Sequence, residues 1–189
     1  MSLLELIAAA DARGLAASGA ACLDRCLPQP TSGTEPDPLR PLWAGCADPD
    51  DWPDRLAEAR AALDALPDPP ESVLRIRTLL GEAPADRSDE ALRAWAGACS
   101  VLALDIHCGH DAVRADATEL VERCRAGDPE GAGPLLSGEA ARQVRILEML
   151  AETGDAAPKG AGLRQVRDVS TEGRRVLRAA VSRRARVRG

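Results

Sequence analysis

Apolar residues recur along most of the chain at intervals of three and four, the spacing of one face of an α-helix. The clearest case is a predicted helix from Ser88 to about Cys108. Its expected buried stripe consists of Leu92, Trp95, Cys99, Leu102 and Ile106. β-Branched and aromatic residues, which favour strands, are scarce, whereas Ala, Leu, Arg and Glu are abundant. The pattern predicts an all-α fold of seven or eight helices.

Helix caps and breakers divide this pattern into elements. A long first helix is expected from Ser2 to about Leu27, bent near Gly14, with Ser2 and Glu5 as its capping box. Further helices are expected over about 39–46, 51–66, 72–80, 88–108, 111–124 and 137–153, followed by a basic segment over 163–189. We therefore expect an all-helical domain over 1–154, a flexible linker over 155–162 and a basic amphipathic C-terminal helix or tail.

A short sequence motif occurs twice. Residues 39–46, with Trp43, resemble residues 92–99, with Trp95. Each copy precedes an Asp-capped helix, an Asp-Pro break and a helix containing Arg-Ile. This order predicts a duplicated three-helix unit over 39–82 and 92–153. The two copies are expected to pack as a helical bundle or as a short α-solenoid whose general architecture resembles HEAT repeats. The unequal lengths of the copies favour the alternative, a chance similarity between Ala-rich helices.

Composition adds two constraints, one on the core and one on the distribution of charge. Phe, Tyr and Asn are absent and Lys159 is the only lysine, which matches a bias against AT-rich codons and leaves three Trp as the only large rings for the core. Charge is also unevenly distributed. Residues 161–189 contain nine Arg against Asp168 and Glu172, a balance of +7, so the rest of the chain carries −13 within the total of −6.

The cellular location is expected to be the cytoplasm. No run of 18 apolar residues is present to span a membrane, and the apolar N-terminus has no basic segment before it. The six cysteines are therefore interpreted as buried free thiols rather than as a disulfide framework.

Both histidines of the chain lie in one cluster with a cysteine. His107, Cys108 and His110 can offer nitrogen and sulfur ligands, and Cys22 and Cys26 lie four residues apart on one predicted helix. Together they predict a zinc or iron site, or a thiol-dependent one. The alternative is that His107 and His110 only end one helix and begin the next.

Motifs for catalysis are absent. The chain contains no Gly-x-Ser-x-Gly turn, phosphate loop or dinucleotide fingerprint, and neither His is preceded three residues earlier by Glu, as in di-iron bundles. His107 and Cys108 are adjacent on a helix and point in different directions, which does not suit a nucleophile and its base. A protein without enzymatic activity is expected.

The C-terminal segment is the second candidate site. A predicted apolar stripe contains Val166, Val169, Gly173, Val176, Ala180 and Val187. The candidate partner-binding residues around it are Arg174, Arg175, Arg178, Arg183 and Arg184. Such a helix can bind an acidic protein surface, an anionic membrane or nucleic-acid phosphates, and it can also dock on the acidic body of its own chain. Nucleic acid is disfavoured because that body would repel it.

Three functional hypotheses follow from these features. The first is a helical adaptor or scaffold that binds another protein. The second is a small metal- or thiol-dependent protein centred on His107 to His110. The third is a regulator that contacts DNA or a membrane through its Arg-rich C-terminus.

Overall fold

The computed structural model describes residues 1–28, 37–111, 116–153, 160 and 162–188. Residues 187 and 188 are described by their backbone alone. Nine α-helices and no β-strand make up the regular structure of these residues, so the all-α class is confirmed and the expected number of helices was too low. The helices are α1 (Leu3–Ala9), α2 (Ala12–Cys26), α3 (Arg40–Ala47), α4 (Trp52–Asp64), α5 (Glu71–Gly81), α6 (Asp89–Gly109), α7 (Ala117–Ala126), α8 (Pro134–Thr153) and α9 (Leu163–Arg188).

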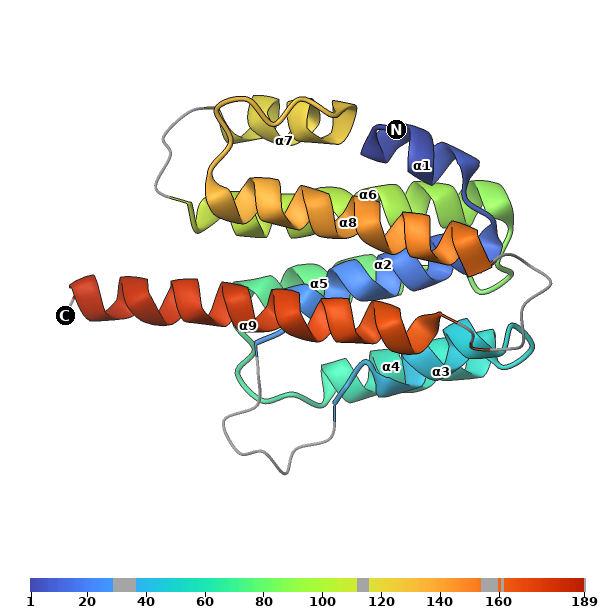
Figure 1. Cartoon of the computed structure of the whole chain (residues 1–189). Coiled ribbons are helices and arrows are strands. Elements are labelled where there is room, and N and C mark those ends of the chain that lie inside the picture. The colour runs from blue at the N-terminus through green and yellow to red at the C-terminus, as the bar shows by residue number, and fades with distance from the viewer. Residues whose placement is uncertain (29–36, 112–115, 154–159, 161, 189) are drawn as a thin grey trace.

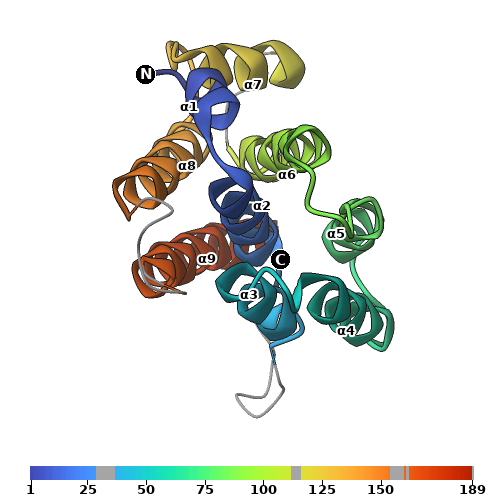
Figure 2. The same cartoon turned by 90° about the vertical axis from the view of Figure 1, so that its right-hand side faces the viewer.

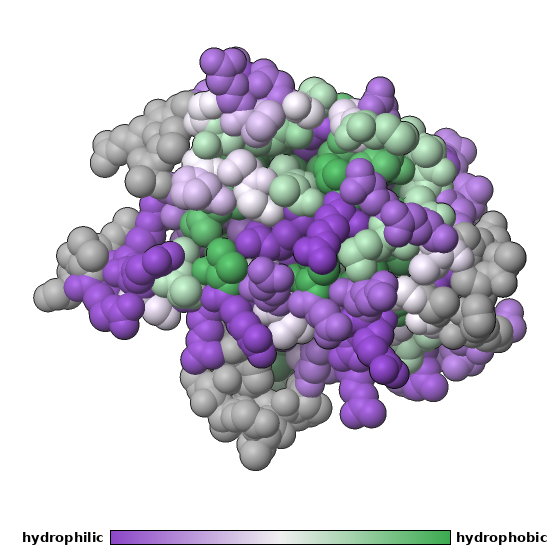
Figure 3. All heavy atoms as spheres, in the orientation of Figure 1, coloured by the Kyte–Doolittle hydropathy of each residue, from purple (hydrophilic) through white to green (hydrophobic). Residues whose placement is uncertain are grey.

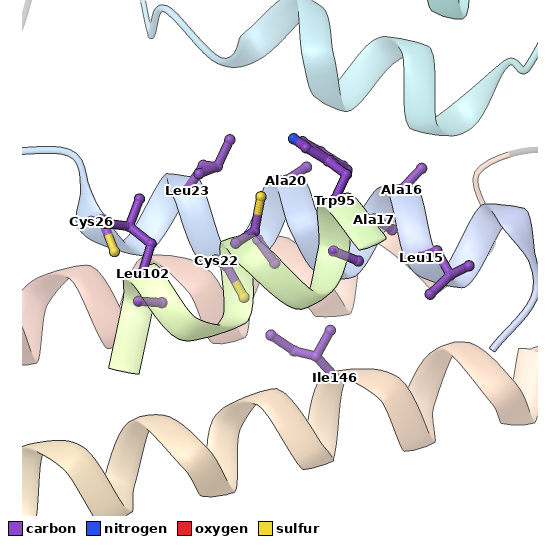
Figure 4. Close-up of a cluster of buried hydrophobic side chains, with 14 of the residues drawn as sticks. Leu15, Ala16, Ala17, Ala20, Cys22, Leu23, Cys26, Trp95, Leu102 and Ile146 are labelled. Carbon is purple, nitrogen blue, oxygen red and sulfur yellow. The ribbon is translucent and has the colours of Figure 1, made fainter. Parts of the chain in front are cut away.

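Helix α2 is the centre of the bundle. Every residue from Gly14 to Cys26 is buried, and α6, α9, α8, α3 and α5 all pack against it (Figure 2). Most of its side chains are Ala, Gly, Ser or Cys, so neighbouring helices approach its backbone closely. Figure 4 shows Trp95 and Leu102 of α6 lying over the small side chains of α2.

The three Trp supply the large rings of the core. Trp52 and Trp95 form a T-shaped pair with ring centroids 6.1 Å apart. Their indole N–H groups donate to the carbonyl oxygens of Pro84 and Leu79, both at 2.8 Å. Each of these two rings thus fills space in the core, and its one polar atom is hydrogen-bonded. The ring contact and the two hydrogen bonds connect α4, α5 and α6.

The prediction of one continuous first helix was wrong. Ala10 and Asp11 adopt extended backbone conformations, and the Asp11 carboxylate accepts a hydrogen bond from the Gly14 N–H at 2.6 Å to begin α2. The predicted capping box of Ser2 and Glu5 is present at the start of α1. The break lets α1 leave the central axis and pack against α8, α7 and α6.

The helix expected to begin at Asp111 begins instead at Ala117, with Asp116 as its N-cap. Asp111 caps a different helix. Its carboxylate accepts from the backbone N–H groups of Leu135 and Leu136 at 3.0 and 2.8 Å, in the first turn of α8. Helix α8 accordingly begins at Pro134 rather than Ser137. A cap contributed from so far along the chain has no local sequence signal.

The predicted duplication is not confirmed. Residues 39–82 hold α3 to α5 and residues 92–153 hold most of α6 to α8, but the two sets pack differently. Helices α6, α7 and α8 contact one another pairwise, whereas α3 packs on α4 and α2, and α5 packs on α4, α6 and α2. Trp43 and Trp95 do not occupy equivalent positions, because Trp43 lies beside α9 and Trp95 lies between α2 and α4. The helices surround α2 as a bundle (Figure 2).

The basic segment forms α9, which lies along one side of the bundle against α2 and α8 (Figure 1). Val166, Val169, Gly173 and Ala180 of the predicted apolar stripe are buried. Val176 is half-buried, Leu177 is also buried, and the side chain of Val187 lies outside the described part. The predicted linker over 155–162 lies outside the described residues except for Gly160 and Gly162. Within the described ranges, none of the helices combines the length and the apolar character needed to cross a bilayer.

We expect Gly19→Ala to destabilise the fold, because a Cβ atom at Gly19 would lie 2.5 Å from the Trp95 ring. Overpacking of this kind costs about 1–3 kcal/mol of unfolding free energy. Gly97→Ala on α6 is the matched control, since only the tip of Arg125 lies near its added Cβ, at 3.9 Å. That change should be neutral or stabilising by up to about 1 kcal/mol. Urea unfolding followed by circular dichroism measures both, and equal effects of the two substitutions would contradict the close contact.

Candidate functional site

A buried ion pair lies at the junction of α2, α8 and α9. Arg25 and Glu139 have fully buried side chains. The Arg25 Nε lies 2.9 and 3.0 Å from the two Glu139 carboxylate oxygens, and one terminal nitrogen lies 2.6 Å from Oε1. The guanidinium also donates to the Ser170 hydroxyl of α9 at 3.4 Å and to the Cys22 sulfur at 3.5 Å. The pair is therefore hydrogen-bonded on both its charged groups, as a buried pair must be.

Two further polar side chains complete the hydrogen bonding of this pair. Gln143, one turn after Glu139 on α8, donates to Glu139 Oε1 at 2.9 Å. Its amide oxygen accepts from the Ser100 hydroxyl of α6 at 2.7 Å. Ser100 and Gln143, like Arg25, also line a small cavity of about 10 Å³.

His107 of α6 lies on the other side of Glu139. Its Nδ1 is 2.7 Å from the Ala103 carbonyl oxygen, which can only accept, so Nδ1 carries the proton in the neutral ring. Its Nε2 lies 3.6 Å from Glu139 Oε2 and has no hydrogen-bond partner among the described residues. The neutral ring therefore presents a lone pair to a carboxylate, and a second proton on Nε2 would turn this contact into an ion pair.

Gly173 allows α9 to approach the cluster. A Cβ atom at this position would lie 2.5 Å from Cδ of Arg25 and 3.1 Å from Cδ of Arg142. The absence of a side chain lets the α9 backbone cover the aliphatic part of Arg25, and Ser170 then reaches the guanidinium. The cluster thus joins α2, α6, α8 and α9 in the centre of the bundle.

Burial and charge set the protonation states in the cluster. Burial alone raises the pKa of Glu139, but attraction to Arg25 and the surrounding hydrogen bonds outweigh it, so that this pKa lies below its ordinary value. Burial lowers the pKa of Arg25, and the charge of Glu139 more than reverses that change. Burial also lowers the pKa of His107, although Glu139 acts in the opposite direction. The pair is charged and His107 is neutral at neutral pH.

This arrangement suits a non-covalent connection between helices rather than reaction with a substrate. Arg25, Glu139 and His107 have no exposed surface. Burial raises the pKa of the Cys22 thiol to about 12, so it remains protonated at neutral pH, a form with little nucleophilic or metal-binding character. Burial likewise raises the pKa of the Cys26 thiol.

The residues of the predicted metal site are placed at different points of the bundle. Cys22, Cys26 and His107 are buried, whereas His110 is half-buried and caps the C-terminus of α6. Cys108 interacts with Cys124 and Asp111 rather than with the cysteines of α2. In the described part of the chain, no group of three or more His, Cys, Asp or Glu side chains is arranged to hold a metal ion. The geometry gives the predicted zinc or iron site no support.

The predicted partner-binding arginines fall into two groups. Arg174 forms an ion pair with the buried Asp24 of α2. Arg184 donates to the carbonyl oxygens of Gly109, the last residue of α6, and of Asp111 just after it. Both attach α9 to the bundle. Arg175, Arg178 and Arg183 have exposed side chains.

The exposed arginines continue beyond the predicted set. The outward face of α9 carries Arg164, Arg167, Arg175, Arg178 and Arg186. Arg164, Arg175 and Arg186 recur at intervals of 11 residues, and each interval corresponds to about three helical turns and about 16 Å. Arg167 and Arg178 have the same spacing, so these five residues, the arginine stripe, share one side of the helix. Hydrophilic side chains predominate over the face on which α9 lies (Figure 3).

Sequence reasoning missed Arg25, Glu139 and Gln143. A signal for them exists, since Arg25 stands between cysteines in a helix of small apolar residues. Glu139 and Gln143 lie four residues apart, in line with Ile146 and Leu150 on the apolar side of α8. Charged and amide residues on the apolar faces of two helices indicate a buried pair, but not which helices meet.

Comparison with known proteins adds no relative. No protein family, curated protein or solved structure matches the chain.

We expect the buried pair to show strong energetic coupling. Arg25→Met and Glu139→Gln should each cost about 3–5 kcal/mol of unfolding free energy, because each leaves an uncompensated group in the core. The double variant should lose clearly less than the sum, since it leaves no unpaired charge. Arg123→Met, which breaks an exposed ion pair with Asp128, should cost no more than about 1 kcal/mol. Strict additivity in urea unfolding would contradict the coupling.

His107 should make stability fall in mild acid. The unfolded chain binds a proton at His107 near the ordinary pKa of 6.5, whereas the folded pKa is lower. The contribution of neutral His107 to the free energy of unfolding is therefore complete above pH 6.5 and is lost as pH falls through the folded pKa. The free energy of unfolding changes by at most about 1.4 kcal/mol per pH unit in this range. Glu139 acts in the same direction but only below its ordinary value of 4.5.

Urea unfolding at a series of pH values below neutrality tests this assignment. His107→Gln should flatten the pH dependence, whereas His110→Gln should leave most of it, because His110 is only half-buried. The assignment fails if His107→Gln keeps the wild-type slope.

Proposed function

We propose that this protein is a helical adaptor that binds an acidic segment of another protein through the outward face of α9. The observation that supports the proposal is the arginine stripe. Internal contacts account for the side chains of Arg174 and Arg184, whereas no side-chain hydrogen bond or ion pair within the described residues is found for Arg164, Arg175 or Arg186. An extended row of such charges suits a partner with carboxylates along one side.

Membrane binding is less well supported. A helix that lies in a bilayer interface needs a free apolar face opposite its basic face. The apolar face of α9 packs against α2 and α8, and its side chains Val166, Val169 and Leu177 are buried. Among the side chains of α9 that the structure describes, Val181 is the exposed large apolar one, at 42%. One such residue adds contact area for a protein partner but does not anchor a helix in lipid.

Nucleic acid is disfavoured for two reasons. The rest of the chain carries −13, which repels phosphate backbones at distances beyond the helix itself. Single-stranded nucleic acid is bound largely by stacking on exposed aromatic rings. All three Trp are buried, and the chain has no Phe or Tyr.

We also infer a cytoplasmic setting for this adaptor. All six cysteines are free thiols, and all six are buried. Free thiols in this number are typical of a reducing compartment.

A binding experiment tests the proposed function. The probe is a fluorescein-labelled, Glu-rich peptide, and fluorescence anisotropy is measured at low and high ionic strength. The double variant Arg175→Glu/Arg186→Glu should lose at least about tenfold in affinity at low salt, and wild-type binding should weaken as salt rises. Arg145→Glu, an exposed arginine on α8, is the matched control and should bind like the wild type.

Two results would contradict the proposal. One is equal affinity of the Arg175→Glu/Arg186→Glu and Arg145→Glu variants for the peptide. The other is tighter binding of the wild type to duplex DNA or to anionic vesicles than to the peptide.

A further inference from the structure

A groove lies between α3 and the N-terminal turns of α9, which run side by side in both views (Figures 1 and 2). Its volume is about 500 Å³. Arg40 and Trp43 line it from α3, and Arg164, Arg167, Asp168 and Thr171 line it from α9. Arg164 and Arg167 are also the first two members of the arginine stripe, so the groove opens at one end of the proposed contact surface.

The groove concentrates positive charge. The side chains of Arg40 and Arg164 are exposed, and neither side chain makes a hydrogen bond or an ion pair within the described ranges. With Arg167 and the single acidic residue Asp168, the charged side chains of the groove sum to +2. Gly160 and Leu163 also line the groove, so the positive end of the α9 dipole lies at the same place.

Trp43 holds one of these arginines in position. Trp43 is 4% exposed, and its side chain contacts Asp24 in the interior. The Arg167 guanidinium lies 5.9 Å from the ring centroid. Stacking of this kind restricts a guanidinium without using its N–H donors, which remain free for a ligand.

From this groove we infer a phosphate-binding subsite that takes a phosphorylated Ser or Thr of the partner's acidic segment. A phosphomonoester carries a charge of about −1.5 to −2 at neutral pH and three strong acceptor oxygens. This matches the +2 of the groove and the several N–H donors of Arg40, Arg164 and Arg167, whereas a single carboxylate has half the charge. The inference rests on the proposed function and makes binding dependent on phosphorylation.

The test compares three versions of one Glu-rich peptide, with phosphoserine, serine or glutamate at its centre, by fluorescence anisotropy with the full-length chain. The phosphoserine peptide should bind at least about tenfold more tightly than the other two. Arg40→Gln/Arg164→Gln should remove that preference, and Arg145→Gln should keep it. Arg167→Lys retains the positive charge but loses the planar guanidinium with its several N–H donors. It should therefore also weaken the preference for the phosphoserine peptide. Inorganic phosphate should compete with the phosphoserine peptide.

The outcomes separate the subsite from the proposed function. Equal affinity for the three peptides, or a preference that survives Arg40→Gln/Arg164→Gln, overturns the subsite, while loss of binding in Arg175→Glu/Arg186→Glu still supports the adaptor. A phosphoserine preference that is insensitive to Arg175→Glu/Arg186→Glu supports the groove and counts against the stripe. Tighter binding to vesicles that contain phosphomonoester lipid, with the same dependence on Arg40 and Arg164, overturns the peptide as the source of the phosphate.

Discussion

The ion pair between Arg25 and Glu139 is the constraint on which the packing of the bundle depends. Removing two charges from water costs several kcal/mol for each ion, which only close contact and complete hydrogen bonding offset. In a core built largely of Leu, Ala and Cys, many relative positions of the helices would bury a similar apolar area. In the observed arrangement Gln143 and Ser170 complete the hydrogen bonding of the pair, and sliding one helix along another would separate these groups. The ion pair therefore favours the observed register of α2, α8 and α9.

The arginines divide between interior and surface along the same helix. Arg174 and Arg184 turn back to Asp24 and to the carbonyl groups at the end of α6, so α9 is attached near both its middle and its C-terminal part. The residues of the arginine stripe are thereby held on a rigid support. A rigid row of charges loses less conformational entropy on binding than a flexible basic tail would.

Local signals predicted much of this fold, and contacts between distant segments account for what they missed. The apolar spacing located most helices, and the stripe Val166, Val169 and Gly173 faces the core as expected. The start of α8 was misplaced because its cap, Asp111, comes from the end of α6. The buried pair was missed because a lone Arg in a helix of small residues does not indicate its partner. The pair can be predicted only when Glu139 is known to lie opposite. The arginines of α9 were found, but their division into anchors and exposed residues depends on which helices lie beneath them.

The placement of the three Trp has an optical consequence. Trp52 and Trp95 lie close enough to exchange excitation energy, and both are enclosed in the core. Trp43 is not part of this pair and lies beneath Arg167 at the wall of the groove. With no Tyr or Phe in the chain, the near-ultraviolet absorption comes almost wholly from these indoles. A change in emission that arises at Trp43 alone would thus report events at one surface of the molecule without added dyes, while the enclosed pair serves as an internal reference.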